Sequence, residues 1–185
     1  MVENARQTAE RKLAEAMPRR WSHVQAVGAK AGRFAPLMLN PKEARLVTAA
    51  AWLHDVGYAP ELATTGFHPL DGARWLRAEG WDERIACLVA HHTCATMEAE
   101  ERGLTLTLES EFHDEGSRLT DFLLYADMTT GPEGSDVDVE TRLDEVESRY
   151  GPGDVVTRFV QRARDRIVYT VRLVETELRV AGYPI

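Results

Sequence analysis

The stretch of sequence that decides the fold is residues 40–57, NPKEARLVTAAAWLHDVG. It opens with a helix start signal, because Asn40 suits the N-cap and Pro41 suits the first helical position. Apolar residues then recur at helical spacing until a His-Asp pair, His54-Asp55, is reached. The stretch therefore predicts a helix with a buried face that presents this pair at its C-terminal end.

The same helical period recurs along the whole chain, and alternating strand patterns hardly occur. We therefore predict an all-α fold. Residues 98–115 are strongly acidic and are expected to be a mobile or insertion-like segment, and residues 131–138 are expected to form a loop. The expected helices cover residues 5–16, 20–34, 40–55, 68–79, 82–92, 117–128 and 154–180.

Composition limits the range of functions. The chain has 185 residues, enough to bury a core without a structural metal, and its formal net charge of -8 with few lysines disfavours binding to a nucleic acid polymer. No apolar run approaches the length of a membrane span or a signal peptide, so no membrane association and a cytoplasmic location are expected. Cys87 and Cys94 lack metal-binding spacing and are expected to be free thiols.

Four histidines and two aspartates adjoin apolar helical patterns rather than polar tracts. Imidazole nitrogen and carboxylate oxygen suit divalent iron, manganese, zinc, cobalt and nickel. Each residue taken alone is more often a core residue or a cap than a ligand, and only the ordered set favours a metal site. The set is His23, His54, Asp55, His68, His92 and Asp127.

Two further histidines are set aside. Adjacent helical residues point about 100° apart, so His91 and His92 rarely face one cavity, and His92 is chosen as the ligand. His113-Asp114 is a second His-Asp pair, but it lies in a polar context with no apolar helix before it. We expect neither His91 nor His113 to bind metal.

The ordered set, with the local strings AWLHDVG, VAHHT and LYADM, resembles the HD-domain superfamily of metal-dependent phosphohydrolases. The resemblance covers roughly residues 20–130. We expect a single HD domain over residues 1–185, with the metal-binding core in 20–130 and a helical C-terminal extension in 131–185, whose final helix lies outside the resemblance. The long final helix either completes the core or pairs with a second copy in a homodimer.

The resemblance also implies a ligand scheme. His23, His54, Asp55 and Asp127 would bind one metal, while His68 and His92 match the dinuclear branch, in which the dyad aspartate bridges two metals. Bacterial HD hydrolases that cleave diadenosine tetraphosphate share this six-ligand order, as do mixed-valent di-iron oxygenases on the same scaffold. Two divalent metals are therefore expected, with iron or manganese favoured over zinc, cobalt or nickel.

The resulting hypothesis is a hydrolase that cleaves a phosphate ester or anhydride of a nucleotide or small phosphorylated metabolite, with Asp55 as the catalytic residue that orients a metal-activated water. The alternatives are an HD-fold di-iron oxygenase that uses dioxygen, and a ligand sensor without activity. Further residues are weaker candidates: Arg74, Arg102 and Arg142 for phosphate, Asp71 and Thr93 for support of the ligands, and Trp52, Trp75, Trp81 and Tyr58 for base stacking.

Overall fold

A computed structural model, which describes residues 1–183, places the decisive stretch in a helix, α3 (Pro41–Leu53). The Asn40 side chain accepts hydrogen bonds from the backbone nitrogens of Lys42 and Glu43, each 3.0 Å away, which confirms the predicted start. The helix ends at the His-Asp pair, since His54 is its C-cap and Asp55 precedes a 3-10 turn, η1 (Val56–Tyr58).

The all-α prediction is confirmed. Over residues 1–183 the regular structure is helical, and the single β-type pairing is an isolated bridge between Thr130 and Asp136. No helix in this range is both long enough and apolar enough to cross a bilayer. The other elements are α1 (Val2–Leu13), α2 (Pro18–Met38), α4 (His68–Ala78), α5 (Glu83–Ala90), η2 (His92–Cys94), α6 (Ala95–Arg102), α7 (Thr105–Glu111), α8 (Arg118–Met128), α9 (Val139–Tyr150) and α10 (Val155–Val180).

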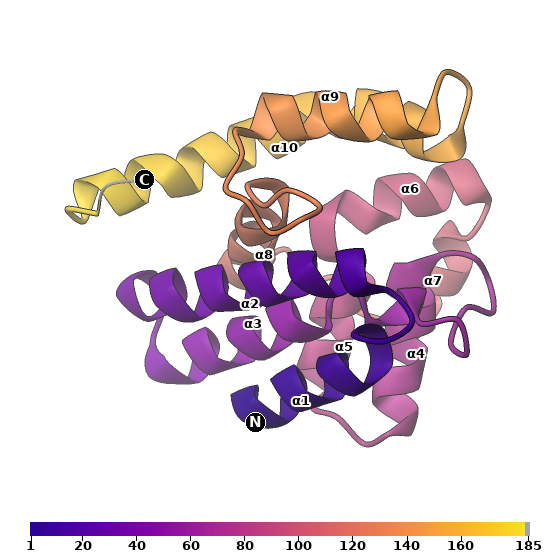
Figure 1. Ribbon diagram of the computed structural model, residues 1–185, viewed down its shortest axis with the longest axis horizontal. Coiled ribbons are helices and arrows are strands. Elements are labelled where there is room, and N and C mark those ends of the chain that lie inside the picture. Colours follow the sequence, from indigo (N-terminus) through magenta and orange to yellow (C-terminus); the bar gives the residue numbers. More distant parts are fainter. Residues whose placement is uncertain (184–185) are drawn as a thin grey trace.

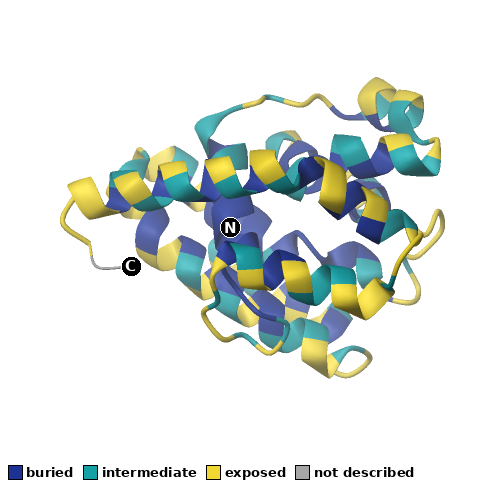
Figure 2. Cartoon of the chain, turned by 90° about the horizontal axis from the view of Figure 1, so that it is seen from above, coloured by how far each residue is buried: buried dark blue, intermediate teal, exposed yellow. Residues whose placement is uncertain are grey.

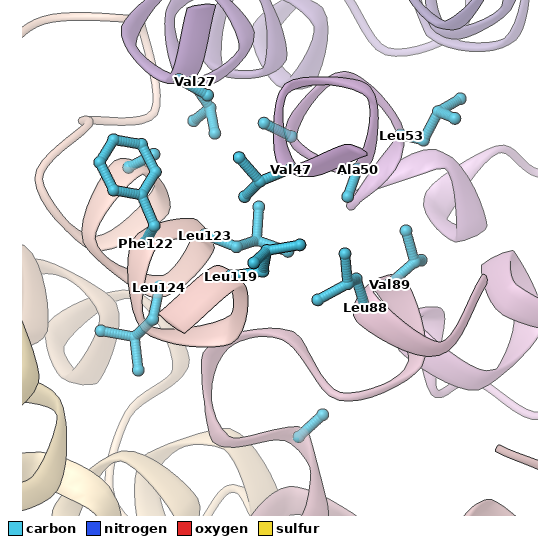
Figure 3. Close-up of a cluster of buried hydrophobic side chains, with 14 of the residues drawn as sticks. Val27, Val47, Ala50, Leu53, Leu88, Val89, Leu119, Phe122, Leu123 and Leu124 are labelled. Atoms are coloured by element: carbon cyan, nitrogen blue, oxygen red, sulfur yellow. The ribbon is translucent and has the colours of Figure 1, made fainter. Parts of the chain in front are cut away.

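Helix α3 lies at the centre of the bundle and packs against α1, α2, α5 and α8. Its central position explains its sequence, because small and aliphatic residues let neighbouring helices approach on several sides. In the core, side chains of α2, α3, α5 and α8 point toward one another, as Val27, Val47, Leu88 and Leu123 illustrate (Figure 3). The ligand-bearing ends of these helices are thereby held in one rigid unit.

Helices α9 and α10 pack on each other and form a layer across one side of the molecule (Figure 1). Buried residues on α10 recur at helical spacing, from Phe159 and Val160 through Ile167 to Leu178, while the residues between the buried positions are partly or fully exposed (Figure 2). The buried face of α10 packs against α8 and α6. The long final helix therefore completes the core of the domain.

Two segments differ from the expectation. The acidic residues 98–115 lie largely within α6 and α7, because Leu108, Phe112 and Ala99 are buried and fix this region onto the bundle. The predicted helix through His92 stops at Ala90, and a 3-10 turn follows. Both errors have the same cause, since charge content and periodicity do not show which contacts a segment makes in the folded protein.

The backbones of η1 and α4 lie very close together, and this contact positions His68 in the candidate site. Gly57, in η1, lies so near the start of α4 that a Cβ built on it would be 2.0 Å from the His68 carbonyl oxygen and 2.6 Å from the Gly72 nitrogen. Only glycine permits this contact. The 3-10 turn after Asp55 is thus locked against the helix that begins with His68.

Candidate metal centre

The predicted ligands come from five separate segments, and the structure brings them together. His23 lies within α2, and Asp127 lies near the end of α8. The other four occupy element boundaries: the end of α3, the first residue of α4 and the start of η2. All are buried except His68, which is partly exposed; the set is His23, His54, Asp55, His68, His92 and Asp127.

The six side chains form two groups of three. The first consists of His23, His54 and Asp127, and the second of Asp55, His68 and His92; within each group the potential ligand atoms lie within 4.8 Å of one another. His23 Nε2 is 3.1 Å from Asp127 Oδ1, and His68 Nε2 is 3.2 Å from His92 Nε2. Atoms that share one ion at about 2.0–2.1 Å lie about 3.0–3.4 Å apart, so these separations fit common coordination.

The Asp55 carboxylate lies between the two groups. Its Oδ2 is 3.3 Å from His54 Nε2 and 3.8 Å from His23 Nε2, both of the first group. Its Oδ1 is 3.3 Å from His68 Nε2, in the second group. Each oxygen of this carboxylate therefore faces a different group, which is the arrangement that a bridging ligand requires.

Three of the histidines are held in one tautomer by backbone carbonyls. In each, Nδ1 donates to a carbonyl oxygen, so in the neutral ring, the form that binds a metal, the Nε2 lone pair is directed at the cluster. The pairs are His23 with Gly131 at 3.1 Å, His54 with Ala51 at 2.8 Å and His92 with Val89 at 2.6 Å. Such an outer hydrogen bond is typical of metal-binding histidines.

An unsatisfied nitrogen gives an independent test of the fit to a metal. His54 Nε2 is fully buried and, although it is near Asp55, it has no hydrogen-bond partner among the described residues. A buried polar atom without a partner is costly, and a metal ion would satisfy it. The donors of the two groups are nitrogen and oxygen only, so the site fits a borderline divalent metal.

For Asp55 and His54, the charges of neighbouring groups outweigh the effect of burial on the pKa, whereas for His68 they do not. Burial alone would raise the pKa of Asp55, but the Arg20 guanidinium and His54 outweigh it and hold that pKa well below its usual range. Burial would likewise lower the pKa of His54, yet Asp55 and Asp127 outweigh it and raise that pKa to about 9. For His68, burial dominates and the pKa lies well below its ordinary value.

These shifts predict how the metal-free protein responds to alkali. The contribution of His54 to the free energy of unfolding is fully present below pH about 6.5 and is lost as the pH rises through about 9. We expect a loss of about 3 kcal/mol between pH 6.5 and 9.5, from a pKa difference of about 2.5 units. Calorimetry of chelator-treated protein should show the melting temperature falling over this range.

A divalent metal should reverse this trend, because it binds neutral imidazole and displaces the proton. His54→Gln has no proton to lose here, so the metal-free variant should show a flatter profile. A wild-type melting temperature that stays constant from pH 6.5 to 9.5 without metal would contradict the prediction.

Two residues outside the ligand set, Arg20 and Thr93, donate hydrogen bonds to its aspartates. The sequence singled out Thr93 but not Arg20. Arg20 Nη1 donates to Asp55 Oδ2 at 2.8 Å and its guanidinium lies 4.1 Å from the Tyr58 ring centre. No motif marked Arg20, which lies in α2 and reaches the site only through the packing of α2 on α3. Thr93 was a candidate, and its hydroxyl donates to Asp127 Oδ2 at 2.5 Å.

The backbone at Thr93 explains how the hydroxyl reaches Asp127. Thr93 and Cys94 have φ of 49° and 61°, the left-handed region that residues other than glycine rarely adopt. Two such residues in succession cost on the order of 1–3 kcal/mol each. The strain lies directly after His92, and it accompanies the turn that brings the Thr93 hydroxyl to Asp127.

The remaining candidates are placed as follows. Arg74 pairs with Glu111 and Arg102 with Glu98, whereas Arg142 is buried beside the cluster. Asp71 accepts from the backbone and hydroxyls of Thr64 and Thr65, so it shapes the loop before His68 rather than the ligands themselves.

The two histidines that the sequence set aside lie outside the cluster. His91 is hydrogen-bonded through both ring nitrogens, to the Phe112 carbonyl and the Thr96 hydroxyl, and His113 is exposed.

A cavity adjoins the cluster. Of the predicted ligands, Asp55, His68, His92 and Asp127 line it. Tyr58 also lines it, whereas Trp52, Trp75 and Trp81 do not. Arg149, which the sequence did not single out, lines it together with Arg20 and Arg142.

An all-α domain in which five segments present histidine and aspartate side chains to a common centre defines a helical domain with a candidate metal site. Comparison with known families agrees, because the model of the HD domain matches residues 20–151. The chain belongs to the HD domain family, whose members are mostly metal-dependent hydrolases and bind divalent metals. No curated protein and no solved structure matches the chain.

Proposed function

We propose that this protein is a metal-dependent phosphohydrolase that cleaves a phosphate ester or anhydride of a nucleotide or small phosphorylated metabolite. Membership of the HD domain family supports metal-dependent hydrolysis in general. The observation that carries the finer proposal is the position of Asp55, whose two carboxylate oxygens face the two groups of histidines beside a cavity lined by three arginines.

The proposed ligands are His23, His54 and Asp127 for one metal, His68 and His92 for a second, and Asp55 for both. Iron or manganese is the first choice, and zinc, cobalt or nickel would accept the same donors. When bound, such metals supply a water of lowered pKa and positive charge next to the phosphate oxygens. Asp55 is the proposed catalytic residue, because its carboxylate is placed to orient that water.

Residues around the ligands would keep this arrangement in place. Arg20 donates to Asp55 and stabilises its carboxylate form, and Thr93 holds the outer oxygen of Asp127. Arg142 and Arg149 share one carboxylate, that of Glu145, so these three side chains keep one net positive charge, while Glu98, which also lines the cavity, is paired with Arg102. That charge favours an anionic substrate.

The proposed substrate is a small molecule. A nucleic acid polymer is disfavoured, because the net charge of -8 repels a long polyanion and the candidate site is a cavity rather than an open basic surface. We also propose a cytoplasmic location. Association into a homodimer is a further expectation, which sedimentation of the full chain would test.

The decisive experiment is anaerobic turnover of protein loaded with iron or manganese on a panel of nucleotides and phosphate esters, analysed by mass spectrometry before and after oxygen is admitted. Hydrolysis predicts phosphate or nucleotide products without oxygen, and their loss on chelation. Product formation only after oxygen is admitted would replace the proposal with an oxygenase. Absence of product under both conditions, at full metal occupancy, would favour a ligand sensor.

A further inference from the structure

The cavity beside the cluster has both polar and apolar residues in its lining. Next to the metal-ligand residues it is polar, and α9 adds Arg142 and Arg149, whereas α10 contributes only apolar residues, which Met128 of α8 and Val146 of α9 extend. Much of this apolar wall lies on α10, beyond the residues that match the HD domain family. It comprises Met128, Val146, Val156, Phe159, Val160 and Ile167.

Glu98 also lines the cavity, and Arg142 is the most deeply buried of the three arginines there. It is 5% exposed, and its Nε atom is buried without a hydrogen-bond acceptor among the described residues. Its Nη1 pairs with Glu145, which also pairs with Arg149. A buried guanidinium N–H without an acceptor is costly, so the site lacks one anionic or carbonyl oxygen that a ligand would supply.

The size of the cavity limits the ligand. Its volume is about 90 Å³, whereas pockets for drug-sized ligands have volumes of roughly 300–1,000 Å³. A phosphate group with a short organic substituent is of the right scale to be enclosed, whereas a nucleoside would extend out of the cavity.

Tyr58, the aromatic residue that packs on a candidate ligand, does not offer a platform for a base. Tyr58 stacks on His68 with ring centres 3.9 Å apart, and the Arg20 guanidinium lies 4.1 Å from the same ring centre. Two groups that close cannot occupy one face of a ring, so both faces of Tyr58 are covered.

We infer that the substrate of this site is a compact phosphate monoester of an apolar alcohol. Its phosphate would lie between the six-residue cluster and Arg142, and its apolar group would pack against Val156, Phe159 and the rest of the wall. This inference rests on the proposed function. In the reaction, a water oxygen bonds to phosphorus, the ester P–O bond breaks, the alcohol leaves with a proton, and inorganic phosphate is released.

The first test uses the metal-loaded full chain and a graded ligand series. Dissociation constants are measured by calorimetry for methyl- to hexylphosphonate, phenylphosphonate and adenosine 5′-monophosphate, and phosphate release is measured for the matching esters. Affinity should rise about fourfold per methylene until the cavity is full. The nucleotide should bind at least tenfold more weakly than the optimal alkylphosphonate.

The second test separates the two halves of the cavity. Arg142→Gln should weaken both inorganic phosphate and phenylphosphonate by about 10- to 100-fold. Val156→Phe, which fills the apolar end from a half-buried position, should weaken butylphosphonate but leave inorganic phosphate unchanged. Arg162→Gln removes an exposed arginine paired with Glu100 and Glu101, so it is the matched control and should change neither. Metal content is measured in each variant.

The possible results distinguish a wrong substrate class from a wrong assignment as a phosphohydrolase. Hydrolysis of nucleotides in preference to every alkyl or aryl phosphate would overturn the substrate class and leave the phosphohydrolase proposal intact. Release of phosphate from neither class by fully loaded protein would overturn both. Unchanged phosphate binding by a folded Arg142→Gln would remove Arg142 from the site, and if that variant does not fold, Val156→Phe and the ligand series still decide.

Discussion

Replacement of Asp55 by asparagine is expected to lower metal content by at least one ion per chain and to reduce hydrolysis about a thousandfold, since metal-dependent stabilisation of this kind is worth several kcal/mol. The carboxylate faces both groups of histidines, with Oδ2 3.3 Å from His54 Nε2 and Oδ1 3.3 Å from His68 Nε2. Asparagine keeps the shape but has no negative charge and one oxygen, so it cannot bridge two cations.

The chain contains its own control for this experiment. Asp114 follows His113 in a second His-Asp pair, and both residues are exposed, so Asp114→Asn should leave metal content and turnover unchanged. Elemental analysis and initial rates on the two variants give the comparison. Full metal occupancy and full activity in Asp55→Asn would refute the ligand assignment.

Substitution of Gly57 by alanine is expected to destabilise the fold by about 3 kcal/mol or more, the upper range for overpacking in a core. The added Cβ would be 2.0 Å from the His68 carbonyl oxygen and 2.6 Å from the Gly72 nitrogen. Both are backbone atoms, so relief requires α4 to move away from η1. Because His68 opens α4, metal content should fall as well.

Gly32→Ala is the matched control, since its added Cβ would meet only Thr48 Cγ2 at an ordinary 3.6 Å inside α2. Alanine is the better helix former by about 1 kcal/mol, so this variant should be at least as stable as wild type. Thermal unfolding of metal-free protein should show a drop of roughly 6–12 °C for Gly57→Ala, at about 2–4 °C per kcal/mol. Equal melting temperatures for Gly57→Ala and wild type would disprove the close contact.

Several elements could be predicted from the sequence, because the residues that specify them are neighbours in the chain. The start of α3 is encoded by Asn40 and Pro41, and Asp154 caps α10 in the same way, with its side chain accepting from the Val156 nitrogen. Helical geometry predicted that only one of the adjacent His91 and His92 would face the site, and His92 was the one chosen. The structure places His92 in the cluster and ties His91 to Phe112 and Thr96.

Other elements left no local signal. Helix α9 was not predicted, because its sequence VETRLDEVESRY carries few apolar residues and is held through Val139 and Leu143, both buried against the rest of the domain. Yet α9 contributes Arg142 and Arg149 to the cavity. Arg20 was missed for a related reason, since its contact with Asp55 joins residues separated by 35 positions.

The sequence by itself determined the helical class, because helix caps and apolar period are written in neighbouring positions, and the order of its histidines and aspartates indicated the family and the six candidate ligands. The tertiary structure alone decided that Asp55 lies between two groups of candidate ligands, that Arg20 and Thr93 donate to the carboxylates, and that α9 and α10 line the cavity beside them. These features depend on distances between segments far apart in the chain, and such distances are set by packing rather than by any local pattern.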